Sequence, residues 1–580
     1  MAIQVTVDHG DSMVANLVGV AIAAHGEGAP APFYVPIRHS ADPMLTRQIE
    51  PARAAELLRP LAAAAGKAKI LHAHKFQAIV LGRAGLPLAG VTMDPQLCSY
   101  TLDPARTTHS LAALAHELVA FTVQTPESLL GKGKKAITFA EAAIDRATHY
   151  ACERAAAALA LGRHLDSELA RAGEAAKRLY MELEMPLAGV LQRLEERGIA
   201  VDPAVLAAQS KVLAADIARL REEIDEHAGH PVNPDSPTQL QKLLFEELGL
   251  EASKKTKTGY STDAAVLEEL SLYHPVVGSI LEYRSLTKLK STYIDTLPLA
   301  INPRTHRLHT SFRQAVAQTG RLSSKDPNLQ NIPVRTELGR QIRAAFVAGP
   351  GKVLVTLDYS QIELRVLAHL SGDQNLSSAF RDGVDVHRRT AAEVFEVPEA
   401  EVTSEQRRVA KAVNFGVIYG QTAFGLARSL GIPRGKAGQY IKAYLAKLPG
   451  VTQYMDLLVE QAKRQGYAET IMGRRRRIPE LGQRGAARSY GERIARNTPI
   501  QGSAADILKK AMIDVDVALA GVDFAQMLLT VHDELIFECE AGKVDALVAI
   551  AKPKMEGAVK LSVPLVVESG SGTSWAECKG

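Results

Sequence analysis

Residues 353–365 read Val353-Leu354-Val355-Thr356-Leu357-Asp358-Tyr359-Ser360-Gln361-Ile362-Glu363-Leu364-Arg365. The first five residues are apolar or β-branched, which predicts a buried strand that ends at Asp358. An isolated aspartate in this position is often no more than the cap of the following helix. The stretch therefore predicts a strand that carries a carboxylate to its end, and it leaves open whether that carboxylate does chemistry.

A second acidic pair, Asp533 and Glu534, lies in a segment that predicts a hairpin. Residues 527–537 read Met-Leu-Leu-Thr-Val-His-Asp-Glu-Leu-Ile-Phe, so two apolar strands flank a tight polar turn. Both acids are expected to project from the tip of this hairpin. Acidic residues are also common in turns for purely conformational reasons, so this pair alone does not establish a site.

Between these two segments, Arg407, Lys411, Phe415 and Tyr419 recur every four residues. On a helix that rises 1.5 Å per residue they would form one stripe about 18 Å long, with two cations ahead of two aromatic rings. Such a stripe could neutralise a triphosphate at its cationic end and stack a base and a sugar at its aromatic end. A purely structural helix would instead bury the rings and leave the cations in water.

The composition is that of an ordinary globular chain. Of 580 residues, 46% are hydrophobic and 23% are charged, which excludes disordered, collagen-like and polytopic membrane classes. At roughly 100 to 200 residues per domain, three to five structural units are expected. The 68 Lys and Arg against 64 Asp and Glu give a net charge of +4, which permits a polyanionic partner without requiring one.

Other sequence signals exclude several kinds of protein. The four cysteines are far apart and form no C-x-x-C pair, so neither a zinc site nor a disulfide framework is expected. The N-terminus lacks a basic region, and its longest apolar run, residues 17–24, is too short for a signal peptide or a membrane span. No phosphate-binding G-x-x-x-x-G-K-[ST] loop and no zinc-protease H-E-x-x-H motif occurs. A cytoplasmic location is therefore expected.

Two kinds of structure are predicted before the acidic segments. Up to about residue 165, short apolar runs alternate with alanine-rich helical stretches, which predicts an α/β unit. Asp202 and Pro203 then form an N-cap and first-turn pair, and apolar residues follow at helical spacing. These apolar residues are Leu213, Ile217, Leu220 and Ile224. We expect a long helix that packs against a partner in a helical hairpin.

Together and in this order, the three segments closely resemble motifs A, B and C of the family A DNA polymerases, the bacterial DNA polymerase I group. The resemblance extends to residues 319–324, 328–333 and 385–388, and to Glu492, Arg493, Asn497, Gln501 and Gly502. It covers essentially the whole chain. The 5′-nuclease domain that usually precedes these regions is not in the sequence, so the chain looks like a large fragment, natural or truncated.

The resemblance implies a multidomain chain of α/β and α+β classes, in which a ribonuclease-H-like 3′-5′ exonuclease-type domain precedes a right-hand polymerase. The implied parts are 1–167 for the exonuclease-like domain, 168–295 for the thumb, 296–365 for the first part of the palm, 366–480 for the fingers and 481–580 for the second part of the palm. Asp358 and Asp533 would then meet in the palm.

The implied activity is template-directed DNA synthesis in replication and repair gap filling, by transfer of nucleotides from deoxynucleoside triphosphates (dNTPs) to a primer 3′-hydroxyl. Asp358, Asp533 and the backbone carbonyl of Tyr359 would hold two Mg²⁺ ions, with Mn²⁺ as a substitute. Glu534 would lie beside the metals without being an obligatory ligand, and Lys411 would give a proton to pyrophosphate. The implied dNTP-binding residues are Arg407, Lys411, Phe415, Tyr419, His387, Gln361 and Glu363. Glu363 would exclude a 2′-hydroxyl by steric clash.

The resemblance also implies contacts with DNA. The residues are Arg321, Asn328, Gln330, Asn331, Arg493, Asn497, Gln501, His532, Lys288 and Lys290. Arg321 and Gln501 would donate to minor-groove acceptors, which lie at similar places in every base pair. The two lysines would contact phosphates, although a charge cluster is as often a solvated face. The implied partners are primer-template DNA and dNTPs, with no membrane, for a monomer associated with the bacterial nucleoid.

The N-terminal region departs from the family where active relatives hold two metals for 3′ to 5′ hydrolysis. When the sequence is anchored on residues 16–19, the four acidic positions fall on Gln4, Thr6, Gln77 and Arg154. Amides, a hydroxyl and a guanidinium cannot supply the anionic charge that two divalent ions require. We therefore expect no proofreading activity. A shifted register would recruit Asp8, Asp11 or Glu153, but it would break the strand phase or the tyrosine spacing of the motif.

Three rival functions stay open at this point. A single-subunit RNA polymerase or a dedicated reverse transcriptase would share the palm geometry, and Glu363 argues against the first. A DNA-binding protein that keeps the fold without activity is the third, since fold does not fix function. The presence of both Asp358 and Asp533 with the complete stripe argues against it.

Overall fold

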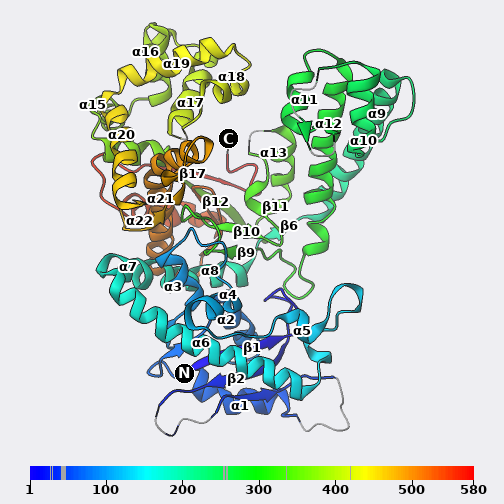
Figure 1. Cartoon of the computed structure of the whole chain (residues 1–580), viewed down its shortest axis with the longest axis vertical. Coiled ribbons are helices and arrows are strands. Elements are labelled where there is room, and N and C mark those ends of the chain that lie inside the picture. The colour runs from blue at the N-terminus through cyan, green and yellow to red at the C-terminus, as the bar shows by residue number, and fades with distance from the viewer. Residues whose placement is uncertain are drawn as a thin grey trace. The chain divides into compact units, whose positions relative to one another are not determined.

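The computed structural model of the chain (Figure 1) describes residues 1–26, 28, 31–40, 48–251, 255–256, 259–334, 336–418 and 420–579. The chain divides into two units. Unit 1 comprises Met1–Arg197, Thr310–Asp326 and Thr356–Ser569. Unit 2 comprises Gly198–His309, Pro327–Val355 and Gly570–Gly580. In the described part of the chain, no helix combines the length and the apolar character that a membrane span requires.

Unit 1 begins with a five-stranded sheet. Its strands are β1 (Ala2–Val7), β2 (Leu17–Ala23), β3 (Phe33–Pro36), β4 (Lys69–Ile70) and β5 (Val91–Met93), in the spatial order β3-β2-β1-β4-β5. The pairs β1–β2 and β2–β3 are antiparallel, whereas β1–β4 and β4–β5 are parallel. This mixed sheet confirms the α/β unit that the alternating sequence pattern predicts.

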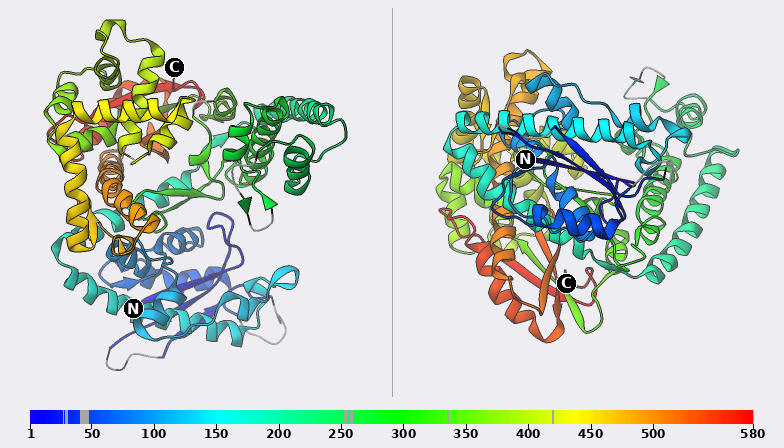
Figure 2. Two further views of the ribbon diagram at one scale, coloured as in Figure 1. Left: turned by 45° about the horizontal axis from the view of Figure 1, so that its top comes forward. Right: turned by 90° about the horizontal axis from the view of Figure 1, so that it is seen from below.

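Helices cover both faces of this sheet. On one face, aliphatic residues of β1 and β2 pack against α1 (Pro51–Ala62) and α2 (His74–Arg83). On the other face, alanines of β2 meet alanines of the long helix α6 (Ile144–Ala172), which crosses the sheet (Figure 2). The small side chains allow α6 to lie close to the strands. Because α6 runs unbroken past residue 167, the predicted domain boundary there falls inside a helix.

The two acidic segments lie in a four-stranded sheet of spatial order β15-β16-β12-β17. The strands are β12 (Lys352–Tyr359), β15 (Ala525–Val531), β16 (Glu534–Glu540) and β17 (Val567–Gly572). The helix α21 (Ala486–Ala518) contacts both α14 (Ile362–Ser371) and α22 (Val544–Glu556). The predicted strand before Asp358 and the predicted hairpin around Asp533 are both confirmed.

Between α14 and α21 the chain is almost entirely helical, in the yellow and yellow-green region of Figure 1. The helices are α15 (Gln374–Arg381), α16 (Val386–Phe395), α17 (Ser404–Ile418), α18 (Ala423–Leu430), α19 (Arg434–Lys447) and α20 (Pro449–Gln465). The helix α17 packs against α16 and confirms a helix at Arg407, Lys411 and Phe415 of the predicted stripe. Tyr419 and the side chain of Phe415 lie outside the described residues.

Unit 2 is built around the antiparallel helices α9 (Pro203–Ala228) and α12 (Pro275–Leu289). The carboxylate of Asp202 accepts hydrogen bonds from two backbone N–H groups at the start of α9, as the sequence predicts. Leu213, Leu220 and Ile224 are buried, and Ile217 is half-buried against the same core. The predicted long helix packed against a partner is confirmed, but the partner α12 is not the next helix along the chain, so the two do not form a simple helical hairpin.

Candidate active site

Asp358 lies on β12 of the second sheet, and Asp533 lies in the turn that leads into the neighbouring strand β16. Asp358 is the seventh residue of β12, and Asp533 stands in the two-residue turn between β15 and β16. The backbone N–H of Tyr359 donates to the carbonyl oxygen of Asp533 at 3.2 Å. The sheet thus joins two segments that are far apart in the sequence. Gln361, not Asp358, is the N-cap of α14, so the interpretation of Asp358 as a helix cap is wrong.

Both acidic segments contain a non-glycine residue in the left-handed region. Gln361 has φ +55° and His532 has φ +56°. A two-residue hairpin turn requires positive φ at its first residue, which accounts for His532. Such conformations cost about 1–3 kcal/mol each and are concentrated at functional sites. The strain marks this end of the sheet as a constrained place in the fold.

Glu534 does not share the position of Asp533. It is the first residue of β16, pairs with Val531 and is buried. The prediction that both acids project from the hairpin tip is therefore wrong for Glu534. The reason is that a two-residue turn returns the next residue to the ladder, where successive side chains point to opposite faces.

Glu363 forms an ion pair with Arg321. The Glu363 side chain is only 4% exposed on α14, whereas the Arg321 side chain is 45% exposed. The side-chain oxygen Oε1 of Gln361, the N-cap residue of α14, is buried and has no hydrogen-bond partner among the described residues. Buried hydrogen-bond acceptors in proteins are almost always paired. The Gln361 oxygen is therefore suited to accept a hydrogen bond from a bound ligand.

The turn that carries Arg321 rests on a buried arginine. Gly320 has φ +89°, and a Cβ atom on it would come within 2.8 Å of Nε of Arg474. Arg474 itself is fully enclosed: it donates to Asp506 at 2.9 and 2.7 Å and to Glu184 at 2.5 Å. Lys509 also donates to Glu184, at 2.7 Å. Glycine is needed at position 320 both for its backbone and for this close approach.

The four residues Glu184, Arg474, Asp506 and Lys509, which we call the buried charge cluster, carry two positive and two negative charges. Burial alone would raise the pKa of Glu184, but Lys509 and Arg474 outweigh it and lower the pKa to about 2. Sequence reasoning missed this cluster. The only local signal is that Asp506 and Lys509 stand on an otherwise apolar face of α21, which is unusual for charged residues.

The four-arginine run of residues 474–477 divides into two pairs. The run enters β14 (Arg475–Arg477), which pairs with β13 (Tyr467–Glu469). Arg474 and Arg476 are buried, whereas Arg475 and Arg477 are exposed. This alternation follows from the two-residue period of an extended chain.

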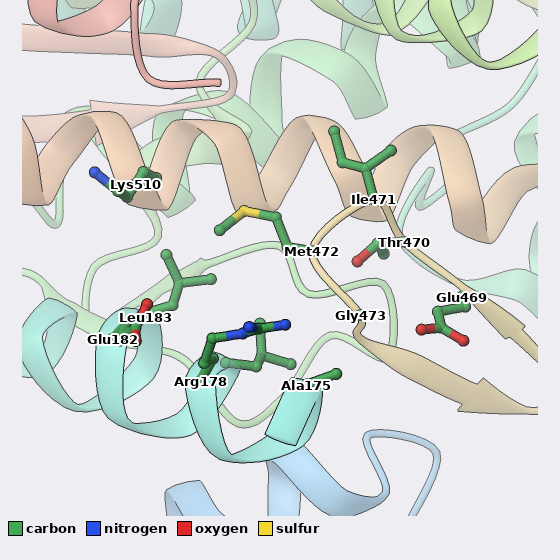
Figure 3. Close-up of a pocket in the computed structure, with 11 residues that line it drawn as sticks. Ala175, Arg178, Glu182, Leu183, Glu469, Thr470, Ile471, Met472, Gly473 and Lys510 are labelled. Carbon is green, nitrogen blue, oxygen red and sulfur yellow. The ribbon is translucent and has the colours of Figure 1, made fainter. Parts of the chain in front are cut away.

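A cavity of about 380 Å³ lies beside the buried charge cluster. Figure 3 shows Ile471 and Met472 at the turn between β13 and β14, with Arg178 and Leu183 opposite and Lys510 of α21 at one side. None of the residues predicted to act on nucleotide or DNA lines this cavity. It is therefore separate from the site around Asp358.

The cationic residues of α17 lie against the start of α16. Nε of Arg407 donates to Oδ2 of Asp385 at 2.8 Å, and the same carboxylate caps the N-terminus of α16. His387, on α16, is only 2% exposed. Its burial, helped by the ammonium of Lys411, lowers its pKa from 6.5 to about 4. His387 is therefore neutral at pH 7, which the sequence alone did not indicate.

The predicted DNA-contacting residues fall in both units. In unit 1, Arg493, Asn497 and Gln501 follow one another at intervals of four on α21 and therefore share a face. Gly502 beside them allows α21 to approach the loop around Thr470, because a Cβ atom there would lie 2.6 Å from Cγ2 of Thr470. His532 occupies the strained turn described above.

The remaining predicted DNA contacts belong to unit 2. Asn328 caps the short helical turn η7 (Leu329–Asn331), which contains Gln330 and Asn331, by accepting from the Gln330 N–H at 3.1 Å. Lys288 is exposed at the end of α12. Lys290 instead forms an ion pair with Asp295 at 2.8 Å. The two lysines that the sequence groups together are thus in different electrostatic surroundings.

The four positions that replace acids lie on β1, α2 and α6, and each makes an internal hydrogen bond or ring contact. Gln77 accepts from the Val5 N–H at 2.9 Å and donates to the carbonyl of His72 at 2.8 Å. Gln4 donates to the carbonyl of Val5 at 2.9 Å. The hydroxyl of Thr6 lies 2.8 Å from the hydroxyl of Tyr34. The guanidinium of Arg154 stacks over the ring of Tyr150. Across the described residues, no three His, Cys, Asp or Glu side chains converge as metal ligands would.

Comparison with known proteins gives two matches to family models. Residues 203–577 match the model described as DNA polymerase family A. Residues 41–161 match the model described as DNA polymerase I, ribonuclease H-like domain. The two matches agree with the order of folds seen in the structure: a mixed sheet with helices on both faces, followed by the second sheet and its helices.

Individual relatives give the same result. The chain is 46% identical over 577 residues to DNA polymerase I of Pseudomonas aeruginosa, and 46% identical over 516 residues to that of Geobacillus stearothermophilus. These alignments cover 98% and 88% of this chain but only 62% and 58% of the relatives, so the chain spans about 60% of their length. Among solved structures, the POL domain of Pol1 from M. smegmatis, in complex with DNA primer-template and dNTP, matches with a TM-score of 0.86 and 38% identity. That match covers 100% of this chain and 96% of the other.

Proposed function

This chain belongs to DNA polymerase family A, and we propose that it extends a DNA primer on a DNA template, using dNTPs, in replication and repair gap filling. The observation that supports the proposal is the backbone hydrogen bond from Tyr359 to Asp533, which places the Asp358 and Asp533 segments next to each other in one sheet. The complex of the M. smegmatis relative with primer-template and dNTP supports the same substrates for this chain. We propose that the chain works as a monomer.

The donor atoms at the site fit Mg²⁺. Asp358, Asp533 and the backbone carbonyl of Tyr359 offer only oxygen ligands, which this hard cation prefers, and Mn²⁺ accepts the same set. When bound, two such ions lower the pKa of the primer hydroxyl and neutralise the leaving pyrophosphate. The fixed pairing of Tyr359 with Asp533 holds these oxygens in place before substrate arrives.

The residues of α17 and α16 provide the nucleotide site in this proposal. Arg407 and Lys411 neutralise the triphosphate, and Lys411 gives the proton that pyrophosphate needs as it leaves. His387 adds a neutral N–H donor, because its pKa is near 4. Phe415 and Tyr419 pack on the sugar and the templating site, and Gln361 offers its buried oxygen.

Glu363 selects the sugar, and Arg321 checks the base pair. The buried Glu363 side chain fills the space that a 2′-hydroxyl would need. Arg321 and Gln501 donate to the minor groove at the primer end, while Arg493 and Asn497 of α21 position the template. His532, Asn328, Gln330, Asn331 and Lys288 complete the DNA contacts. Lys290 contributes less, because Asp295 already neutralises it.

The N-terminal domain lacks proofreading activity in this proposal. Gln4, Thr6, Gln77 and Arg154 provide no carboxylate, and Gln77 already uses its amide oxygen and nitrogen to join β1 to the carbonyl of His72. The domain then serves to pack against the rest of unit 1. A 3′-labelled mismatched primer, incubated with Mg²⁺ and no nucleotides, should keep its label. Steady release of the terminal nucleotide that Asp8→Ala abolishes, and Asp358→Ala does not, would contradict this part.

Primer extension with Mg²⁺ tests the proposed activity against its rivals. Four reactions compare dNTPs with ribonucleotides and a DNA template with an RNA template. We expect rapid extension with dNTPs on DNA and much slower extension in the other three reactions. Preference for ribonucleotides would indicate an RNA polymerase, preference for the RNA template a reverse transcriptase, and DNA binding without extension a non-catalytic protein.

A further inference from the structure

We propose that Asn414 is a positioning residue for nucleotide binding, because its side-chain amide holds His387 in the tautomer that carries its proton on Nε2. The consequence for nucleotide binding rests on the proposed function. The tautomer itself does not, and it can be measured separately.

The geometry around Asn414 determines which atom faces His387. Nδ2 of Asn414 lies 2.8 Å from Nδ1 of His387, and the hydroxyl of Thr390 donates to Oδ1 of Asn414 at 3.3 Å. Asn414 is 0% exposed, so no water competes for either atom. An amide NH₂ group can only donate, and Nδ1 must therefore present its lone pair. The proton of the neutral ring then lies on Nε2.

The charges around the ring favour the same state. Lys411 and Arg407 of α17 oppose a positive charge on His387, whereas Asp385 favours one. Asp385 is already engaged, because it accepts from Arg407 and from the backbone N–H groups at the start of α16. A second ring proton would also point at the Asn414 donor. The ring is thus kept neutral by its neighbours as well as by burial.

The cationic residues and His387 therefore have different roles in nucleotide binding. Arg407 and Lys411 supply charge to the triphosphate, and His387 supplies one N–H donor in a fixed direction. Without the Asn414 amide, the His387 ring can take either tautomer. For part of the time Nε2 then carries no proton and cannot donate to the nucleotide. We expect Asn414→Leu to raise KM for dNTP by roughly threefold to tenfold, which is less than a full hydrogen bond to an anion because the donor is lost for only part of the time. The value of kcat should change much less, because the bond does not depend on the transition state.

The tautomer can be read directly from the ¹⁵N chemical shifts of the imidazole rings at pH 7. The signals of His387 are identified by their loss in His387→Gln. We expect an unprotonated Nδ1 and a protonated Nε2 in the unmodified protein. In the nearly isosteric Asn414→Asp, the new carboxylate should attract a proton to Nδ1. A proton on Nδ1 in the unmodified protein, or a doubly protonated ring, would overturn the inference even if primer extension proceeds normally.

A double-mutant cycle tests whether Asn414 acts through His387. Asn414→Leu, His387→Gln and the double variant are compared by KM for dNTP, with thermal unfolding as the check that each is folded. If Asn414 positions His387, the double variant should have the KM of His387→Gln alone. Additive increases in KM would show that Asn414 has a merely structural role. If Asn414→Leu does not fold, Asn414→Asp takes its place in the cycle.

Discussion

The backbone N–H of Tyr359 donates to the carbonyl oxygen of Asp533, next to the point where the neighbouring strands β12 and β16 bring the two acidic segments together. Asp358 precedes Tyr359 directly, so the bond fixes both carboxylates relative to the same sheet. The positive φ of His532 turns the chain so that Asp533 can take this place. Backbone geometry therefore sets the relative positions of these two segments.

The buried Glu363 side chain, which is paired with Arg321, predicts how deoxynucleotides are selected over ribonucleotides. Glu363→Ala should open space for a 2′-hydroxyl and raise the ratio of ribonucleotide to deoxynucleotide kcat/KM by roughly 10-fold or more. Glu363→Gln is the matched control, because it keeps the volume and removes the charge that holds Arg321. We expect Glu363→Gln to leave the ratio nearly unchanged. Equal ratios in all three proteins would show that steric exclusion is not how the sugar is selected.

The buried charge cluster predicts a large effect on stability. Arg474→Met should leave Asp506 without its cation and Glu184 with Lys509 alone, at a cost of about 3–5 kcal/mol. In thermal unfolding, this should lower the midpoint by roughly 3–5 °C. Arg53→Ala, which breaks an exposed pair with Glu56, is the control and should cost about 0.5 kcal/mol or less. The cluster would have little importance if the two variants unfolded at the same temperature.

Buried histidines predict loss of stability in mild acid. Burial lowers the pKa of His72 from 6.5 to about 4, so its stabilising contribution is complete above pH 6.5 and is lost as the pH falls towards 4. The contribution is at most about 3 kcal/mol. That of Glu184, whose pKa is about 2, is lost only below pH 4.5. Between pH 6.5 and 4.5, the decline should therefore come from histidine.

His72→Gln, measured by thermal unfolding across this pH range, checks the assignment. Its midpoint should fall less steeply with pH than that of the unmodified protein. His149→Gln, at an exposed position, is the control and should leave the slope unchanged. Identical slopes for all three would rule out His72 as a source of the acid sensitivity.

The different surroundings of Lys288 and Lys290 predict different roles in DNA binding. Lys288→Ala should weaken binding to all sequences and reduce the slope of log affinity against log salt by about 1. Lys290→Ala should change the slope much less, because the lysine is paired with Asp295. Titrations of a labelled primer-template at several salt concentrations measure both slopes. The reverse order of the two effects would refute this reading of the ion pair.

Local patterns were enough to predict much of the fold. The apolar run before Asp358 became β12, the four-residue spacing of Arg407 and Lys411 became α17, and Asp202 caps α9. Each of these features depends on residues near one another in the chain, where strand and helix periods are directly visible.

Features that depend on distant partners were not predicted. Glu184 and Arg474 meet only in the folded chain, and neither carries a local mark of its partner. The neutral state of His387 follows from burial against α17, and its bond to Asn414 links two helices. Glu534 is buried because a two-residue turn returns it to the ladder. These are tertiary effects, which periodicity does not contain.

We propose that Asp358 and Asp533 hold the metal ions for nucleotide transfer. The most direct test is the single-turnover rate of dNTP incorporation by Asp358→Asn, which keeps the shape of the side chain and removes its charge. DNA affinity is measured in parallel to show that the variant still binds its substrate.

We predict a rate lower by several orders of magnitude, with DNA affinity within a few-fold of the unmodified protein, because the charge stabilises the transition state and the phosphate contacts lie elsewhere. A rate within tenfold of the unmodified protein would contradict the account.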